Sequence, residues 1–328
     1  MPKNFSMGVL VGLVLLVLGV STFILTVKIK RHWTQLDDGS SFFAQQQPPR
    51  QLEQQWIVSG NQAQTLIAQG AILLDARSCK LFSCSPQFEA ISIRWQYFSQ
   101  SASIFRGNLL KNDQVLTTKL QSMGIDMDKP VVVMGDPQRG WGEEGRIVWM
   151  LRTLGHSQAV LVDGGYRALL GSQKGVDGEI RGVKAKKTGN FVVKRRDNWL
   201  IEGDELQGSW KRNQTNLVII DTRSSPEYQG KTPYGESRGG HIPGAIHLHY
   251  RELLDHDGKL LPREQIITKL EKLGITKEHL IVSYCTGGVR SGWLTAVLVD
   301  LGFAAKNYAG SMWEWSGSAE GDYPLQQL

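Results

Sequence analysis

The residues best suited to chemistry lie in one short stretch of the second half of the chain, from Val282 to Ser291. Cys285 ends a run of apolar residues typical of a buried strand, and Arg290 precedes another apolar run with helical spacing. The two glycines between them let the backbone curl so that its N–H groups point inward, and the positive end of the next helix points to the same place. A thiol held in this way loses its proton readily and becomes a nucleophile.

Cys285 is one of only 3 cysteines, and the alternative interpretation is a packing role, because cysteine is often a small buried hydrophobe. The glycine pair and Arg290 favour the reactive role, since packing requires neither. For Arg290 two roles stay open, which are binding an anionic substrate and holding the loop through its carbonyl groups. We expect Cys285 to be catalytic and the following residues to form the active-site loop: Thr286, Gly287, Gly288, Val289 and Arg290.

From about residue 198 to residue 316 the sequence resembles the rhodanese family of sulfurtransferases. Four motifs carry the resemblance in order, which are Asp221-Thr222-Arg223, the segment 239–246 (Gly-Gly-His-Ile-Pro-Gly-Ala-Ile), the Cys285 loop and the segment 308–315. Asp221 and Arg223 stand two apart on a strand and can face the same side. We expect these two residues and His241 to support the fold rather than to take part in the chemistry.

The resemblance implies a double displacement. The Cys285 thiolate takes the outer sulfur of a small anionic donor, thiosulfate or 3-mercaptopyruvate, and passes it from a persulfide to cyanide or a thiol, with no cofactor. The loop sequence Thr286-Gly287-Gly288 matches neither the basic loop of the thiosulfate type nor the Gly-Ser pair of the mercaptopyruvate type. Glu227 also stands near a position where some relatives carry a donor-binding arginine. The physiological donor therefore stays open.

Two other functions compete with this one. A cysteine loop that ends in arginine also suits a phosphatase or an arsenate reductase, but related phosphatases have five residues between Cys and Arg and this chain has four, Thr286 to Val289. The other alternative is a persulfide carrier or redox-sensing module with little turnover, whose acceptor protein is unknown.

The first half of the chain repeats sequence features of the second half. Asp75-Ala76-Arg77 repeats Asp221-Thr222-Arg223 at an offset of 146 residues, which is far too long for a solenoid repeat. The predicted fold is α/β, with two tandem rhodanese-like domains that are each a mostly parallel sheet flanked by helices. We expect a non-catalytic domain at 57–172, a linker at 173–196 and a catalytic domain at 197–318. The alignment puts Asp136 in the place of Cys285, and a carboxylate cannot accept a sulfane sulfur.

The first residues suggest a membrane anchor. The segment 7–27 is almost wholly apolar and uncharged, and about 20 such residues span a bilayer as a helix. This pattern predicts one transmembrane helix followed by a flexible linker at 28–56. The positive-inside rule weakly favours a cytoplasmic globular part, and the opposite face stays open.

Composition narrows the choice of partners. The net charge is +6, but no stripe of basic and aromatic residues indicates a nucleic-acid partner, and a modest positive field favours small anionic substrates. No metal is expected, because His241, His247 and His249 lack ligands at zinc-like spacing. For Cys79 and Cys84 we favour unpaired thiols over a disulfide or a resolving role.

Overall fold

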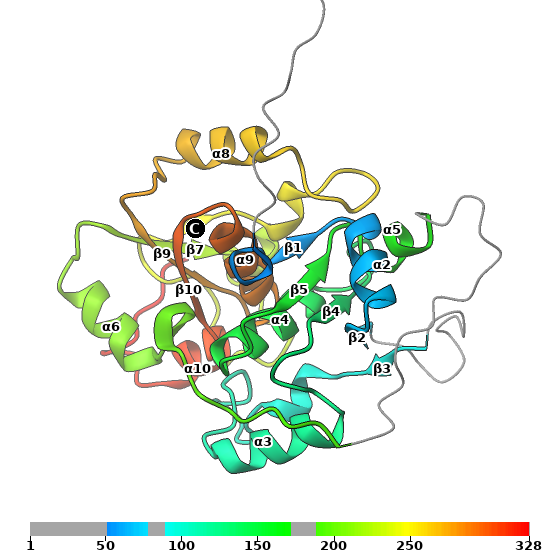
Figure 1. Ribbon diagram of the computed structural model, residues 1–328. Coiled ribbons are helices and arrows are strands. Elements are labelled where there is room, and N and C mark those ends of the chain that lie inside the picture. The colour runs from blue at the N-terminus through cyan, green and yellow to red at the C-terminus, as the bar shows by residue number, and fades with distance from the viewer. Residues whose placement is uncertain (1–50, 78–88, 172–187, 328) are drawn as a thin grey trace, which may run out of the picture. The chain divides into compact units, whose positions relative to one another are not determined.

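The computed structural model describes residues 51–77, 89–171 and 188–327. The chain separates into two compact units, Met1–Pro49 and Arg50–Leu328. All described residues belong to the second unit. That unit contains two five-stranded sheets with helices around them (Figure 1).

The first sheet has the strand order β1-β5-β4-β2-β3, and every pair of neighbouring strands is parallel. Its strands are β1 (Ile57–Val58), β2 (Ile72–Asp75), β3 (Ile91–Ser92), β4 (Val131–Met134) and β5 (Ala159–Val162). The helices of this half are α2 (Gly60–Ala68), α3 (Asp113–Ser122), α4 (Glu143–Thr153) and α5 (Gly165–Gly171), with short 3-10 helices at η1 (Leu52–Gln54) and η2 (Trp95–Phe98).

The second sheet repeats this topology, with the order β6-β10-β9-β7-β8 and only parallel pairs. Its strands are β6 (Leu200–Ile201), β7 (Leu217–Asp221), β8 (Ile246–His247), β9 (Leu280–Tyr284) and β10 (Ala304–Tyr308). The helices are η3 (Asp197–Trp199), α6 (Gly203–Lys211), α7 (Ser225–Tyr228), η4 (Tyr250–Leu253), α8 (Arg263–Lys272), α9 (Val289–Asp300) and α10 (Ser311–Gly317). Two parallel sheets flanked by helices fit the predicted α/β class and a tandem rhodanese-like arrangement.

Strand residues alternate between two cores because successive side chains point to opposite faces of a sheet. On β4, Val131 and Val133 belong to a large central core, whereas Val132 and Met134 belong to a separate cluster on the other face. The central core also includes residues of the second sheet, such as Ile281. The two sheets therefore share one hydrophobic core.

Helices α4 and α9 lie side by side in this central core (Figure 1). Each helix begins directly after a glycine in the left-handed conformation, Gly142 with φ 81° and Gly288 with φ 79°. At Gly145 a Cβ atom would lie 2.7 Å from the Trp293 Cβ atom, so the absence of a side chain lets the two helices approach closely.

The prediction of membrane localisation needs correction. Within the three described ranges, no helix is both long enough and apolar enough to cross a bilayer. That prediction depended on the segment 7–27, which lies outside these ranges. Residues 28–50 of the predicted linker also lie outside them. The described end of that linker is folded, because Trp56 is 2% exposed in the central core.

The described part of the predicted linker at 173–196 runs along the first half. Phe191 and Val193 are buried in the central core. The backbone N–H groups of Lys194 and Arg196 donate to the carbonyl oxygens of Leu154 and Thr153 at 2.9 and 2.8 Å.

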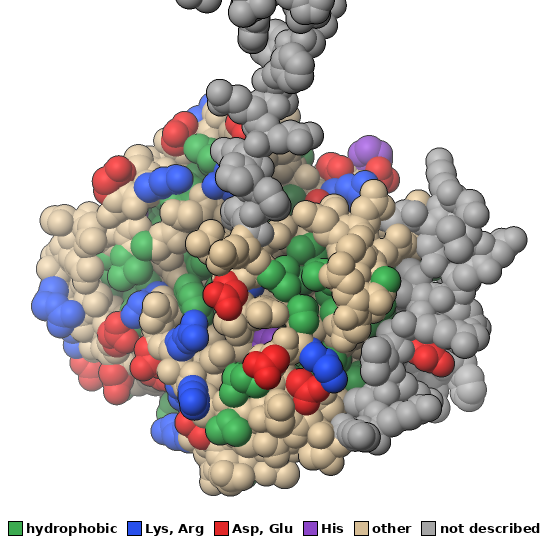
Figure 2. Space-filling model, in the orientation of Figure 1, with side chains coloured by type: hydrophobic (Ala, Val, Ile, Leu, Met, Phe, Trp, Pro, Cys, Tyr) green, Lys and Arg blue, Asp and Glu red, His purple; other side chains and the backbone are tan. Residues whose placement is uncertain are grey.

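Charged residues are mixed on the face of the molecule in Figure 2. Lys and Arg side chains there alternate with Asp and Glu side chains rather than gathering into one basic patch. On this face the net positive charge of the chain is therefore dispersed among groups of both signs.

Candidate active site

Cys285 directly follows β9, at the carboxyl edge of the parallel sheet, where open α/β sheets bind their ligands. The residue is 1% exposed. Its backbone N–H donates to the Ser311 hydroxyl at 3.1 Å, and its carbonyl oxygen accepts from the Met312 N–H at 3.1 Å. Ser311 has φ 52°, in the left-handed region that only a few non-glycine residues adopt. The backbone N–H and C=O groups of Cys285 are thus both held by residues at the start of α10.

Hydrogen-bond donors surround the sulfur. The Gly288 N–H donates to the Cys285 Sγ at 3.1 Å, and the Ser291 hydroxyl lies 3.6 Å from it. Burial by itself raises the pKa of the thiol. The positive charge of Arg290 and hydrogen bonds from the Ser291 and Gly287 groups outweigh burial, so the pKa of Cys285 lies below its usual value. The direction of this shift is the one that a reactive thiol requires, and the thiolate itself stays a prediction.

Arg290 lies in the first turn of α9 and forms a buried ion pair. Its Nη1 and Nη2 atoms donate to the two carboxylate oxygens of Glu227 on α7 at 2.8 and 2.7 Å. Nη2 also donates to the Thr286 hydroxyl at 2.8 Å. The guanidinium holds the pKa of Glu227 at about 2 against the opposing effect of burial. Of the two roles left open for Arg290, the contacts favour holding the loop, because its charge is already paired.

A second carboxyl group meets the loop from the segment 231–237, which is part of the connection between α7 and β8. The Thr286 hydroxyl lies 3.1 Å from Glu227 and 3.2 Å from Glu236. Glu236 is 7% exposed and also accepts from the Tyr234 N–H at 3.0 Å. The wall around Thr286 thus carries two carboxyl groups and one guanidinium.

Aromatic side chains close the entrance. The Trp313 ring occupies the space that a side chain at Gly287 would need. Arg106, from the first half, stacks on Trp313 at 3.9 Å and donates to the Tyr234 carbonyl oxygen at 3.1 Å. Trp141, also from the first half, packs edge-on against Tyr234 with ring centroids 4.8 Å apart. Both halves therefore contribute side chains to the aromatic cluster beside the active-site loop.

The predicted supporting residues are buried beside this site. The Arg223 Nε and Nη2 atoms donate to the Asp221 carboxylate at 3.0 and 2.7 Å. Neither side chain has any exposed surface. Arg223 also donates to the Gly240 carbonyl oxygen at 2.6 Å. The His241 Nδ1 lies 3.0 Å from the Tyr228 carbonyl oxygen, and its ring stacks on Tyr228. These contacts tie β7 to the turn before β8.

In the first half, Gly135 and not Asp136 stands in the place of Cys285. Met134 pairs with Asp75 as Tyr284 pairs with Asp221, and the Gly135 carbonyl oxygen accepts from Tyr166 as the Cys285 carbonyl oxygen accepts from Met312. The alignment by sequence was therefore wrong by one residue. The error arose because the loop from Gly135 to Trp141 is longer than its counterpart, so no local signal fixed its register.

Glu144 fills the first half's equivalent of the sulfur position. Its carboxyl group lies where a side chain on Gly135 would be, and the residue is 1% exposed. The second position of α4 holds Glu144 as the second position of α9 holds Arg290. Burial, reinforced by the negative charges of Glu143 and Asp136, raises the pKa of Glu144 to about 8.

The sequence did not identify Arg146, Ser291 or Glu236 as site residues. Arg146 lies on α4, and its Nη1 donates to the Gly288 carbonyl oxygen at 3.1 Å. Only the contact between α4 and α9 brings it there, so no motif could have indicated it. Cys79 and Cys84 lie outside the described residues, and the prediction for them stays a prediction.

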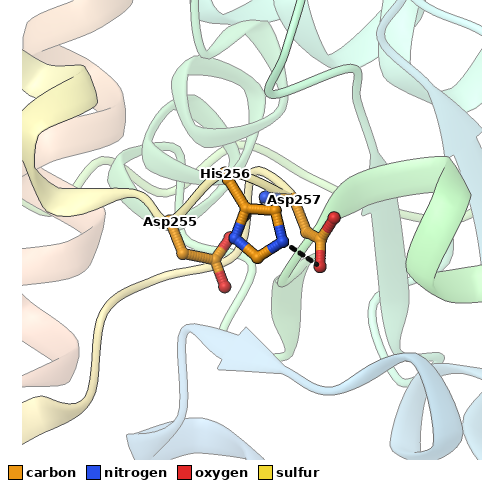
Figure 3. A group of neighbouring side chains, drawn as sticks. All are labelled: Asp255, His256 and Asp257. Atoms are coloured by element: carbon orange, nitrogen blue, oxygen red, sulfur yellow. Dashed lines mark hydrogen bonds and ion pairs between the residues drawn. The ribbon is translucent and has the colours of Figure 1, made fainter.

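One group of possible metal ligands lies far from this chemistry, on the loop after η4 (Figure 3). Asp255, His256 and Asp257 place their ligand atoms within 4.8 Å of one another. The Asp255 Oδ1 already accepts from the N–H groups of Asp257 and Lys259, both at 2.9 Å. These bonds describe a turn capped by an aspartate, which explains the grouping without an ion.

The rhodanese-like domain pattern matches residues 205–318. A thiosulfate sulfurtransferase of Pseudomonas aeruginosa is 32% identical over 194 residues, which are 59% of this chain and 69% of that protein. The chain belongs to the rhodanese family. A thiosulfate sulfurtransferase of Azotobacter vinelandii is 33% identical over 56% of this chain and 65% of that protein, so the match spans slightly less than two thirds of that relative. A protein named sulfur carrier protein TtuD from Thermus thermophilus is 30% identical over 60% of this chain and 71% of its own length.

Solved structures agree on the fold. Tum1 from Saccharomyces cerevisiae has a TM-score of 0.68 at 18% identity, covering 84% of this chain and 98% of its own. Wild-type EanB has a TM-score of 0.67 at 19% identity, covering 85% of this chain and 71% of its own. Together with the rhodanese relatives named sulfurtransferases, the family match supports sulfur transfer as the class of reaction and a transferase as the class of enzyme.

Proposed function

We propose that this rhodanese is a sulfurtransferase that carries a sulfane sulfur as a persulfide on Cys285. The observation that supports this most directly is the position of the sulfur, which receives the Gly288 N–H at 3.1 Å at the start of a twelve-residue helix. Backbone N–H groups and the positive end of a helix stabilise a sulfur anion, whether thiolate or persulfide.

The first half-reaction loads the enzyme. The Cys285 thiolate attacks the outer sulfur of thiosulfate, a new S–S bond forms to Sγ, and the bond between the two donor sulfurs breaks. Sulfite leaves with the bonding electron pair, and Cys285 becomes a persulfide anion. No proton, metal or redox cofactor enters this balance.

The second half-reaction returns the thiolate. An acceptor such as cyanide attacks the outer sulfur of the persulfide, a C–S bond forms, and the S–S bond to Sγ breaks. The electron pair returns to Sγ, and thiocyanate leaves. Gly287, Gly288 and Ser291 supply the same N–H and O–H donors to the sulfur before and after the transfer.

Phosphatase or arsenate chemistry is less well supported. That chemistry needs an arginine free to bind an oxyanion, but both terminal nitrogens of Arg290 are engaged by Glu227. Glu236 adds a further carboxyl group beside Thr286. A phosphoryl group would have to be enclosed by the loop next to these two carboxyl groups, whereas thiosulfate, which is also a dianion, needs to bring only its outer sulfur to the Cys285 Sγ.

A persulfide carrier is the second candidate, and the closed site favours it. Cys285 is 1% exposed, and Trp313 and Tyr234 lie over the loop. A carrier with this geometry would be loaded by one protein and discharged by another, with slow turnover on free small molecules. The relative from Thermus thermophilus is named a sulfur carrier protein.

Intact mass spectrometry after exposure to thiosulfate or 3-mercaptopyruvate tests the proposal. We expect a gain in mass of one sulfur atom that is lost on adding cyanide, together with formation of thiocyanate or pyruvate. Cys285→Ser should abolish the gain, whereas Cys79→Ser and Cys84→Ser should retain it. Fast loading with negligible turnover would favour the carrier, and no loading by any donor would contradict both functions.

A further inference from the structure

Arg146 is a buried arginine from the first half that reaches the active-site loop of the second half. Its side chain has no exposed surface. Nη1 donates to the Gly288 carbonyl oxygen at 3.1 Å, and Nη2 donates to the Gly107 carbonyl oxygen at 2.7 Å and lies 3.4 Å from the Ser99 hydroxyl. Gly288 thus contacts Arg146 through its C=O group and the Cys285 sulfur through its N–H group.

All hydrogen-bond partners of Arg146 are electrically neutral. Within the part of the chain that the structure describes, no carboxyl group lies at ion-pair distance from its guanidinium, and Nε has no partner. Two other buried arginines at the site differ, because Arg223 is paired with Asp221 and Arg290 with Glu227. A buried charge without a counter-ion is costly, so an isolated arginine at this depth requires explanation.

The charges around the sulfur indicate what pairs with Arg146. The groups that face Cys285 are Arg290 on α9, Glu227 on α7, Glu236 on the segment 231–237 and Arg146 on α4. Arg290, whose charge lowers the pKa of Cys285, is also paired with Glu227 at 2.7 Å, whereas Arg146 has no carboxylate partner among the described residues. Burial lowers the pKa of Arg146 to about 9, and the negative charge of Cys285 acts in the opposite direction.

We propose that Arg146 is a second counter-ion, beside Arg290, of the Cys285 thiolate and of its persulfide, supplied across the α4–α9 contact by the half of the protein that lacks the active-site thiol. Arg146 acts as a positioning residue, since it holds the Gly288 carbonyl oxygen and adds its field to the sulfur. Arg290, with its charge already paired, holds the loop. The inference depends on the proposed function only for the persulfide, because the thiolate can be measured without a sulfur donor.

The pH profile of Cys285 alkylation by iodoacetamide tests this inference, followed at the Cys285 peptide by mass spectrometry. Arg146→Met is the main variant, because it removes the charge and keeps an unbranched side chain of similar length. We expect its alkylation midpoint to rise by about one pH unit or more, the usual effect of removing a nearby opposite charge. Arg146→Lys keeps the charge and should stay closer to the wild type.

Arg152→Gln is the matched control. Arg152 lies on the same helix and is 2% exposed, but it donates to backbone carbonyl oxygens such as those of Ala159 and Glu53, away from the loop. Its loss should lower stability and leave the alkylation midpoint unchanged. If Arg146→Met and the wild type share one low midpoint, the inference is overturned. A wild-type midpoint at the ordinary cysteine value of about 8.5 would instead contradict the thiolate on which the proposed function depends.

Discussion

At the scale of single residues, the site separates into groups whose charges are paired and groups whose charges are not. Arg290 and Glu227 form a bidentate pair, and Asp221 and Arg223 form another. Glu144 and Arg146, which stand two residues apart at the start of α4, have no such partner in the described residues. Glu227 is therefore a buried carboxyl group with a counter-ion, and Glu144 is one for which the described residues supply none.

Glu227→Gln should destabilise the protein. The change leaves the Arg290 guanidinium buried without its anion, and breaking one side of a buried pair costs about 3–5 kcal/mol. The pKa of Glu227 is about 2 in the folded protein and about 4.3 in an unfolded chain. The stabilisation is therefore present above about pH 4.3 and is lost as the pH falls toward 2. Chemical denaturation at pH 7 and pH 3 measures it.

The difference between Glu227→Gln and the wild type should accordingly be smaller at pH 3 than at pH 7. Glu205→Gln is a suitable control, because Glu205 forms an exposed ion pair with Lys306 at 3.3 Å, and such pairs contribute about 0–1 kcal/mol. An equal difference at both pH values would show that the Glu227 carboxylate is not stabilised by Arg290.

Glu144→Gln should stabilise the protein at alkaline pH. The folded chain keeps the Glu144 proton up to a pKa of about 8, whereas the unfolded chain releases it near pH 4.3. Stability therefore falls as the pH rises between these values and is constant above pH 8. We expect the Tm of the variant to exceed that of the wild type at pH 8 and to match it near pH 4.5. The exposed Glu264→Gln should shift the Tm little, and a variant less stable at pH 8 would contradict the assignment.

At the scale of elements, the loops after β4 and β9 differ in length. Between β9 and the glycine that starts α9, only Cys285, Thr286 and Gly287 intervene, so the helix start lies directly over the sulfur. Between β4 and Gly142 there are seven residues, and the first helical turn brings a carboxyl group instead. Two halves with the same strand order thus place different groups at the start of their central helices.

Gly287→Ala should disrupt this connection. A Cβ atom there would overlap the Trp313 ring, and overpacking of this kind costs about 1–3 kcal/mol. We expect a lower Tm and a lower rate of sulfur loading, because either Trp313 or the loop must shift. Gly171→Ala, which would meet no atom within 4 Å, should change neither. Normal loading by Gly287→Ala would mean that the Trp313 contact is not needed for the loop geometry.

At the scale of the whole unit from Arg50 to Leu328, each half depends on the other for its packing. The central core contains residues of both sheets, and Trp293 on α9 covers Gly142 and Gly145 of the first half. The Trp56 N–H also donates to the Asp300 carboxylate at 2.8 Å. Removing either half would expose a large apolar face of α9 or α4 to water.

A fragment from residue 197 to the end should therefore not fold on its own, although it contains every residue that the sequence indicated for catalysis. We expect it to lack cooperative thermal unfolding by circular dichroism and to form no persulfide. The unit 50–328 should unfold cooperatively and load sulfur as the full chain does. A stable, active fragment would contradict both the shared core and the role proposed for Arg146.

The sequence by itself determined the features that depend on neighbouring residues. The apolar run before Cys285 predicted strand β9, and the order of Cys285, the glycines and Arg290 predicted the sulfur loop, because backbone N–H groups and helix direction follow from local geometry. The pairing of Asp221 with Arg223 was also local, since two residues on a strand share a face.

Only the tertiary structure decided the features that depend on distance across the chain. It replaced Asp136 by Gly135 as the counterpart of Cys285, because strand register is set by hydrogen bonds between strands and not by spacing along one loop. It showed that Arg290 forms an ion pair with Glu227 and that Arg146, from the other half, donates a hydrogen bond to the Gly288 carbonyl oxygen. Electrostatic energy depends on separation in space and on burial, and neither quantity can be obtained from the order of residues.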